Sequence, residues 1–222
     1  MSAPRIAAVI GSPVAHSLSP AIHQAAFDAA GVNWTYTAFD ITDAAAALSA
    51  MRLLGLAGLS VTMPLKEDVA RAVDRLDSAA RALHSVNTVS WDGDELVGSS
   101  TDGAGFVASL AAAGVKVDGA QIAVIGAGGA ARSVIDALGR AGAADITVLN
   151  RTRDRAEHAA SLSKAASVGI ASDITRADIV INATSVGMGV SVDDATDADM
   201  ACDPPLLRSG QVVADLVYHP LE

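Results

Sequence analysis

Glycines at positions 126, 128 and 129 directly follow the apolar run 121–125, and an alanine-rich helical pattern comes directly after them. A strand, the spacing Gly-x-Gly-x-x-Ala and a helix, in this order, are the fingerprint of a dinucleotide-binding turn. The first glycine permits a tight turn, the second lets the backbone approach a pyrophosphate, and free N–H groups of the helix attract the phosphates. The motif therefore predicts cofactor contacts from Gly126, Ala127, Gly128, Gly129 and Ala130.

Basic residues follow the next predicted strand, 145–149, about 20 residues further along the chain. A site that prefers NAD usually carries an acidic residue at this strand end, where it binds the ribose 2′-hydroxyl. Here Asn150 occupies the position, and three arginines follow it, Arg151, Arg153 and Arg155. Because guanidinium groups suit a phosphate dianion, the pattern favours NADP. The alternative is that the arginines only begin a solvated helix.

A nicotinamide site also needs a group that moves the proton of the reacting alcohol. Lys66 and Asp102 are the candidates, because an amine beside a carboxylate can supply or relay a proton. Each comes where the chain leaves regular structure, and Lys66 is one of only three lysines among 15 basic residues. The alternatives are a solvated helix start for Lys66 and a helix N-cap for Asp102.

Polar residues elsewhere in the first half are further candidates. Ser17 and Ser19 precede a helical pattern and could hold a carboxylate with its N-terminus, or Ser19 could simply cap that helix and leave Ser17 idle. Asn87 could donate to a substrate hydroxyl or satisfy a turn. The five histidines show no metal-ligand spacing, and Cys202 lies in an acidic loop, so we expect no metal site.

Composition limits the classes of partner. The 222 residues are 51% hydrophobic and 18% charged, as in a soluble globular protein, and a net charge of −10 argues against nucleic acid and anionic membranes. A single cysteine excludes an intrachain disulfide and fits the cytoplasm. The chain has no apolar run of about 18 residues, the length of a membrane span. We expect a cytoplasmic protein with a small-molecule partner.

Strands and helices alternate along the chain, which predicts an α/β fold with parallel βαβ units in both halves. In the first half we predict strands at 5–10, 34–40, 56–62, 86–91 and 95–98, with a hairpin around 92–93, and helices at 21–30 (opened by Ser19 as N-cap and Pro20), 43–54, 67–76 and 78–83. In the second half we predict helices at 104–113, after residue 129, and at 153–162, and strands at 121–125, 145–149, 167–170, 178–182 and 211–217. The expected domains are 1–103, which binds substrate, and 104–222, a Rossmann-type dinucleotide-binding domain.

Taken together, these residues resemble the shikimate dehydrogenase family. Eight segments along essentially the whole chain carry the resemblance, in order and spacing: Gly11-Ser-Pro-x-x-His-Ser-x-Ser-Pro20, Ser60-Val-Thr-Met-Pro-Leu-Lys66, Val86-Asn-Thr88, Thr101-Asp-Gly-x-Gly-Phe106, Gly126-Ala-Gly-Gly-Ala-Ala-Arg132, Asn150-Arg-Thr152, Asn182-Ala-Thr-Ser-x-Gly-Met188 and Asp215-Leu-Val-Tyr-x-Pro220. The resemblance implies reversible reduction of 3-dehydroshikimate to shikimate by NADPH, a step toward chorismate and the aromatic amino acids.

The resemblance also implies roles for individual residues. It makes Lys66 and Asp102 the catalytic pair and implies substrate contacts from Ser17, Ser19, Thr62, Lys66, Asn87, Asp102 and Tyr218, of which the two serines hold the carboxylate. It implies that the adenosine 2′-phosphate is held by Asn150, Arg151, Thr152 and Arg155. Thr184 is expected at the cofactor as well, and Leu216 beside the nicotinamide.

The chain departs from the family pattern in two places. Ser100 stands where the family usually has Asn before Thr-Asp, and the family continues beyond Tyr-x-Pro with a glycine near the nicotinamide, a substrate-binding glutamine and a closing helix. Nothing in 189–222 replaces these, which predicts a Rossmann domain without its last segment, an exposed sheet edge and a shortened relative with weak or no activity. The alternatives are a quinate/shikimate dehydrogenase that uses NAD and a truncated, non-catalytic NADP-binding relative. We expect a monomer or homodimer.

Overall fold

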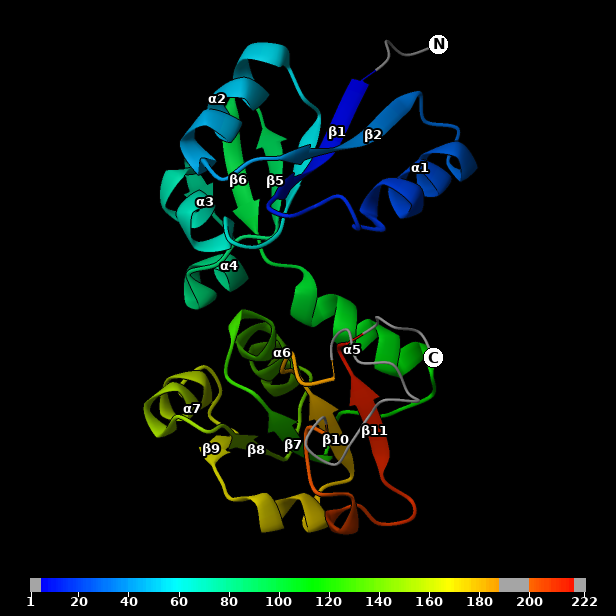
Figure 1. Ribbon diagram of the computed structural model, residues 1–222, viewed down its shortest axis with the longest axis vertical. Coiled ribbons are helices and arrows are strands. Elements are labelled where there is room, and N and C mark those ends of the chain that lie inside the picture. The colour runs from blue at the N-terminus through cyan, green and yellow to red at the C-terminus, as the bar shows by residue number, and fades with distance from the viewer. Residues whose placement is uncertain (1–4, 188–199, 218–222) are drawn as a thin grey trace. The chain divides into compact units, whose positions relative to one another are not determined.

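The chain folds into two compact units, Met1–Thr101 and Asp102–Glu222, in a computed structural model that describes residues 5–187 and 200–217. The boundary between the units falls two residues before the 103/104 boundary predicted from the sequence. Each unit has its own sheet and its own hydrophobic core, so each is considered separately (Figure 1).

Unit 1 is built on a six-stranded sheet with the strand order β2-β1-β3-β5-β6-β4. The strands are β1 (Arg5–Gly11), β2 (Trp34–Asp40), β3 (Gly58–Val61), β4 (Arg75–Leu76), β5 (Thr88–Asp92) and β6 (Glu95–Ser99). β1 pairs in parallel with β2 and β3, and β4 pairs in parallel with β6. β5 runs antiparallel to both β3 and β6. The hairpin predicted around residues 92–93 is therefore confirmed: the chain reverses in a tight turn through Gly93 (φ +61°), and this sheet combines parallel and antiparallel pairs.

Helices cover both faces of this sheet (Figure 1). α2 (Ala44–Leu54), α3 (Lys66–Ala72) and α4 (Ser78–Leu83) pack on one face, where Met51, Leu65 and Val69 are fully buried. α1 (Ser19–Ala29) lies on the other face against Tyr36 and Val9. The alternation of side chains along β1 and β3 supplies both faces.

Hydrogen bonds between distant segments explain where the elements of unit 1 differ from expectation. The helix predicted at 67–76 ends at Ala72, and β4 replaces its last turn. Asp74 Oδ2 accepts a hydrogen bond from the N–H of Leu96 at 2.7 Å, and the N–H of Asp77 donates to Gly98 O at 2.9 Å, so the chain is drawn onto the edge of the sheet. These contacts join residues more than twenty positions apart, which helical periodicity cannot reveal.

Unit 2 is built on five parallel strands with the order β11-β10-β7-β8-β9, the five strands predicted. They are β7 (Gln121–Ile125), β8 (Asp145–Leu149), β9 (Ala166–Val168), β10 (Ile179–Asn182) and β11 (Val212–Asp215). The last strand is shorter than the predicted 211–217. The helices are α5 (Asp102–Ala112), α6 (Gly129–Arg140) and α7 (Arg153–Ala160), and two 3-10 segments, η1 (Ala171–Arg176) and η4 (Pro204–Leu206), were not predicted.

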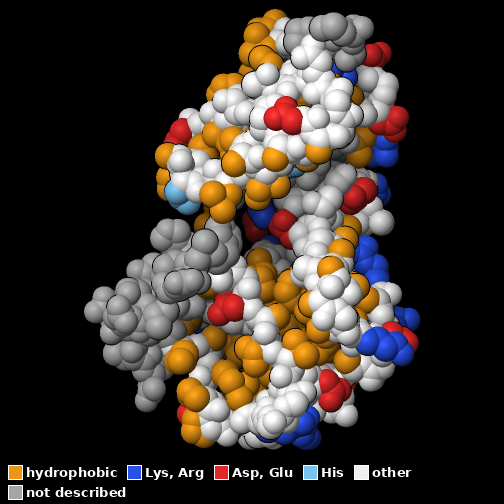
Figure 2. Space-filling model, turned by 90° about the vertical axis from the view of Figure 1, so that its right-hand side faces the viewer, with side chains coloured by type: hydrophobic (Ala, Val, Ile, Leu, Met, Phe, Trp, Pro, Cys, Tyr) orange, Lys and Arg blue, Asp and Glu red, His pale blue; other side chains and the backbone are white. Residues whose placement is uncertain are grey.

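The two faces of the unit 2 sheet are covered unequally. α5, α6 and α7 bury Ile122, Val124 and their neighbours in a large core, whereas Ala123 and Val180 face η1 and η4 in a smaller one. β11 is an edge strand of the described sheet, and Val213 on it is 57% exposed. Figure 2 shows hydrophobic side chains at the surface over this unit among scattered charged ones. None of the described helices combines the length and apolar character needed to cross a membrane.

The contact of α5 with α6 requires a glycine. Gly103 is buried, its N–H donates to Ser133 Oγ at 2.8 Å, and a Cβ on it would overlap the Ser133 carbonyl and approach Ala137 Cβ to 2.8 Å. The absence of a side chain at this position therefore fixes how closely the first turn of α5 packs on α6.

This contact predicts opposite effects for two glycines of one helix. We expect Gly103→Ala to lower the free energy of unfolding by about 1–3 kcal/mol, because the added methyl group overpacks the contact. Gly105→Ala is the matched control: a Cβ there meets nothing within 4 Å. It should raise stability by about 0.4–1 kcal/mol, as alanine does in a helix. Urea unfolding of both variants provides the comparison, and equal destabilisation would contradict the close approach.

Candidate functional site

In unit 1 the loops after β1 and β3 lie side by side where the two strands end. The N–H of Thr62 donates to Ile10 O, and the N–H of Ser12 donates to Met63 O, both at 2.9 Å. Gly11 has a φ of +154°, and a Cβ on it would collide with the Thr62 methyl group and lie 2.6 Å from Met63 O. A glycine is therefore required for the first loop to approach the second, and this approach brings the segments of Ser17 and Lys66 to one edge of the sheet.

Ser17 and Ser19 lie at the start of α1, and their roles differ from the simplest expectation. The helix begins at Ser19 itself, with Leu18 at the N-cap position, so the prediction of Ser19 as N-cap is wrong. Ser17 Oγ instead accepts a hydrogen bond from the N–H of Ser19 at 3.2 Å, so Ser17 is not idle. Both serines are only half-buried, so their hydroxyl groups can reach a ligand.

Lys66 is the first residue of α3, one turn after Thr62. The N–H of Leu65 donates to Thr62 O, and the N–H of Val86 donates to Lys66 O, each at 3.0 Å. The fully buried side chain of Leu65 anchors this turn in the core. Lys66 and Thr62 are themselves half-buried, so solvent or a ligand can contact their side chains. The backbone of this turn is held in place by the hydrogen bonds above.

Asn87 holds together three segments of unit 1. Its carbonyl oxygen accepts from the N–H of Val61 at 2.7 Å, and its own N–H donates to Ser99 O at 3.0 Å. Its side-chain Oδ1 accepts from the N–H of Thr101 at 3.0 Å, and Nδ2 donates to Thr101 Oγ1 at 2.9 Å. These bonds show that Asn87 satisfies a turn and fixes Thr101, the residue directly before Asp102, while its contact with a substrate hydroxyl stays a prediction.

Asp102 begins α5 and belongs to unit 2, whereas Lys66 belongs to unit 1. The pairing of the two side chains therefore stays a prediction.

In unit 2 the glycine-rich turn has the geometry that a pyrophosphate requires. Gly126 has a φ of +116°, and a Cβ on it would lie 2.8 Å from Ala183 O, so only glycine fits between β7 and the loop after β10. Gly128 is the extended N-cap of α6, and a Cβ on Gly128 or Gly129 would meet nothing within 4 Å. Open space therefore lies over the free N–H groups of α6, and a dinucleotide phosphate fits it.

The loop after β10 is held by a buried asparagine. Asn182 is 5% exposed; its Nδ2 donates to Asp215 Oδ1 at 3.0 Å, and its Oδ1 accepts from the N–H and the hydroxyl of Thr184 at 3.0 and 2.7 Å. The N–H of Leu216 donates to Asn182 O at 3.0 Å. Asn182 and Asp215 thus position Thr184 and Leu216, the two outlying cofactor candidates. Asn182 and Asp215 begin two separate sequence motifs, which gave no sign that the two residues pair.

The basic segment lies at the carboxyl end of β8 and the start of α7. Asn150 Nδ2 donates to Thr152 O at 2.9 Å, and Thr152 is the N-cap of α7. Arg153 pairs with Glu157 at 2.8 Å and is thereby directed along the helix. Arg151 and Arg155 are exposed and have no ion pair with any residue in the described ranges. Two guanidinium groups are thus available for an anion beside the glycine-rich turn.

A cavity of about 400 Å³ opens at this end of the sheet. Asn150 and Arg151 contribute its polar edge, and its apolar wall includes Ile125, Leu149 and Ile170. The sequence did not point to the wall residues after β9, because they belong to the unpredicted η1 region. Burial and the neighbouring Asp203 raise the pKa of the Cys202 thiol, which lines this cavity, so the thiol stays protonated at neutral pH.

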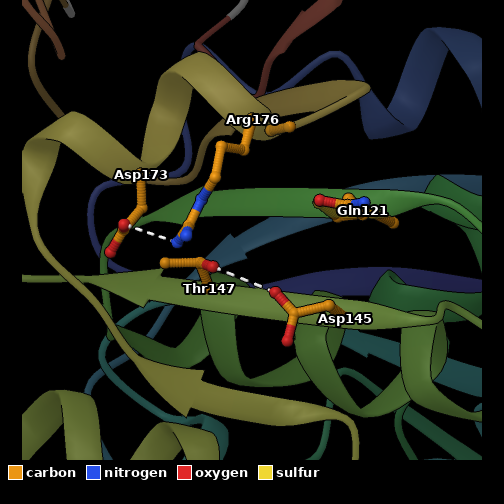
Figure 3. A pocket seen from close by; sticks show the side chains of 7 residues that line it. Gln121, Asp145, Thr147, Asp173 and Arg176 are labelled. Atoms are coloured by element: carbon orange, nitrogen blue, oxygen red, sulfur yellow. Dashed lines mark hydrogen bonds and ion pairs between the residues drawn. The ribbon is translucent and has the colours of Figure 1, made fainter.

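A second, smaller cavity of about 270 Å³ lies at the opposite, amino-terminal end of the strands (Figure 3). Gln121 and Asp145, the first residues of β7 and β8, line it. Asp173 pairs with Arg176 at 2.6 Å, and Thr147 donates to Asp145 at 3.2 Å, so these polar groups already satisfy one another. In the described part of the chain no cluster of three or more His, Cys, Asp or Glu residues could hold a metal ion.

Comparison with known proteins assigns the chain to one family. Residues 9–89 match the "Shikimate dehydrogenase substrate binding domain" family, and residues 109–200 match the "Shikimate / quinate 5-dehydrogenase" family. The shikimate dehydrogenase (NADP(+)) of Moorella thermoacetica is 40% identical over 230 aligned positions, covering 98% of this chain and 76% of that protein. The chain belongs to the shikimate dehydrogenase family.

Solved structures of the shikimate dehydrogenase family share the fold. Shikimate 5-dehydrogenase from Listeria monocytogenes, in complex with shikimate and NAD, superposes with a TM-score of 0.88 at 30% identity, covering 99% of this chain and 80% of that one. The Thermus thermophilus enzyme, in complex with NADP(H) and shikimate, has a TM-score of 0.85 at 33% identity, covering 97% and 80%. The predicted fold class, a substrate domain followed by a Rossmann-type domain, is confirmed.

The two glycines of the turn are expected to respond differently to substitution. Gly128→Ala should leave the free energy of unfolding within about 1 kcal/mol of the original, because the methyl group enters open space. It should weaken dinucleotide binding by about tenfold or more, since a close backbone approach to pyrophosphate is lost. Gly126→Ala should instead lower stability by about 1–3 kcal/mol, because it strains the backbone. NADPH fluorescence titration and urea unfolding separate the two effects; unchanged affinity in Gly128→Ala would contradict the assignment.

Proposed function

We propose that this chain is an NADP-dependent shikimate dehydrogenase, which reversibly reduces 3-dehydroshikimate to shikimate. The observation that carries the proposal is the combination, along one chain, of the open glycine turn, the basic start of α7 and the Thr62–Lys66 turn, with 40% identity to an enzyme named shikimate dehydrogenase (NADP(+)). A quinate/shikimate dehydrogenase that uses NAD is disfavoured, since Asn150 and not an acidic residue directly follows β8.

The cofactor residues follow from the geometry of unit 2. The N–H groups at the start of α6 bind the pyrophosphate above Gly128 and Gly129. Arg151 and Arg155 hold the adenosine 2′-phosphate, with Asn150 and Thr152 beside them. Ala127 and Ala130 complete the turn, and Thr184 and Leu216, held by Asn182, border the nicotinamide end. NADP, when bound, supplies or accepts the hydride.

The substrate residues bind, orient and exchange a proton. Ser17 and Ser19 hold the carboxylate with the start of α1, while Thr62 and Asn87 contact ring hydroxyls. Lys66 and Asp102 exchange the proton of the reacting oxygen. Tyr218, the remaining expected contact, lies outside the described residues.

We also propose a cellular compartment and an oligomeric state for the protein. A single cysteine and a net charge of −10 fit a cytoplasmic enzyme that acts as a monomer or homodimer on a small molecule.

Turnover tests the activity. The purified chain should reduce NADP with shikimate, and Lys66→Ala should lower kcat by about 10²–10⁴-fold, as expected when a general acid is removed. Lys116→Ala, a variant of an exposed lysine that pairs with Asp118, is the control and should match the original. Faster turnover of quinate with NAD would contradict the substrate and cofactor, and NADP binding without any turnover would indicate a non-catalytic relative.

Cofactor choice tests the basic segment. The double variant Arg151→Gln/Arg155→Gln should raise KM for NADP about 10–100-fold, the loss expected for charge-assisted hydrogen bonds, and leave KM for NAD unchanged. Arg153→Gln is the matched control, because Arg153 already pairs with Glu157. If KM rises equally for both cofactors, the arginines stabilise the domain and do not read the 2′-phosphate.

A further inference from the structure

A buried tyrosine on β2 contacts the substrate strand of unit 1. Tyr36 is 7% exposed, and its hydroxyl group donates to Ser60 Oγ at 2.6 Å. Burial raises the pKa of Tyr36 above its usual range, so the phenol stays protonated and acts as a donor at neutral pH. Ser60 lies on β3, twenty-four positions further along the chain.

Ser60 faces the same side of the sheet as Thr62. Leu59 and Val61 are buried in the core on the other face, so strand alternation turns Ser60 and Thr62 toward α1. Ser60 is half-buried, and within the described ranges its hydroxyl proton has no acceptor. Since Tyr36 occupies one lone pair of Ser60 Oγ, the Ser60 O–H remains available as a donor to a ligand beside Thr62.

Tyr36 also fixes α1, the helix that carries Ser19. No residue of α1 is fully buried, so packing alone holds it weakly. The ring of His23, one turn after Ser19, stacks on Tyr36 with a centroid distance of 4.3 Å and an interplanar angle of 4°. Gln24 Oε1 accepts from the N–H of Tyr36 at 3.1 Å. Tyr36 thus touches both sides of the substrate site, α1 through its ring and β3 through its hydroxyl group.

We propose that Tyr36 is a positioning residue of the substrate site, which orients Ser60 so that the Ser60 hydroxyl donates to a ring oxygen of the polyhydroxylated substrate. The proposal rests on the proposed function, because it assumes that the substrate lies between Ser19 and Thr62. It adds two residues, Tyr36 and Ser60, to the groups that recognise the substrate, and gives His23 a role in holding the carboxylate-binding helix.

The test separates positioning from stability. Tyr36→Phe keeps the ring and its stack on His23 but removes the donor, and Ser60→Ala removes the acceptor. Each should raise KM and the calorimetric Kd for shikimate about fivefold, the usual effect of one hydrogen bond, with KM for NADP and the melting temperature nearly unchanged. The double variant should resemble either single one, because both remove the same contact. Thr35→Val, on the exposed face of the same strand, is the control.

Three outcomes would overturn the proposal: an unchanged Kd for shikimate in Tyr36→Phe, a lower melting temperature as its only effect, or additive losses in the double variant. Calorimetry keeps this test separate from the test of activity. If the original chain binds shikimate without turning it over, the dehydrogenase assignment fails while the Kd comparison still decides the role of Tyr36. If the chain binds no shikimate at all, both proposals are contradicted.

Discussion

Both sheets depend on one close approach of backbone that only glycine permits. Gly11 ends β1 where the chain after β3 passes, and Gly126 follows β7 where the chain after β10 passes. In each case a Cβ would collide with the neighbouring loop, at Thr62 in the first sheet and at Ala183 in the second. β1 is flanked by β2 and β3, and β7 by β8 and β10, so in each sheet the chain leaves the central strand in one direction and later returns on the other side. Such switch points are where open α/β sheets bind ligands.

The same placement accounts for how an acidic chain can hold anions. With a net charge of −10, the long-range field of the protein repels a phosphate or a carboxylate. The attraction is therefore local: the free N–H groups of α6, the exposed Arg151 and Arg155, and the start of α1 beside Ser17. The N–H groups of α6 adjoin the second glycine turn, Ser17 follows Gly11 closely in the chain, and the arginines follow Leu149, whose carbonyl oxygen accepts from the N–H of Gly126 at 2.8 Å. Screening by salt limits such interactions to short range, so the positions matter more than the total charge.

The sequence predicted the cofactor half better than the substrate half, and the reason is physical. The residues that a tight turn requires are consecutive in the sequence and can be recognised there. Gly126 permits the close approach, Gly128 and Gly129 leave open space, and the run 121–125 forms the strand. The parallel order of unit 2 follows from the same alternation. In unit 1 the short strand β4 and the pairing of β5 with β3 depend on contacts between distant segments, such as Asp74 with Leu96, and no local pattern encodes these.

The proposed cofactor region of unit 2 and the proposed substrate region of unit 1 also differ in what holds them. The cofactor side relies mainly on backbone groups and missing side chains, so its residues are small and tolerate few replacements. The proposed substrate region relies on side-chain pairs between segments, Tyr36 with Ser60 and Asn87 with Thr101, which fix the loops. NAD and NADP present the same pyrophosphate, whereas a substrate is recognised by its own pattern of hydroxyl groups. Side-chain pairs can change by single substitutions without disturbing the strands, so this half of the fold is the one in which substrate choice can vary while the dinucleotide turn stays constant.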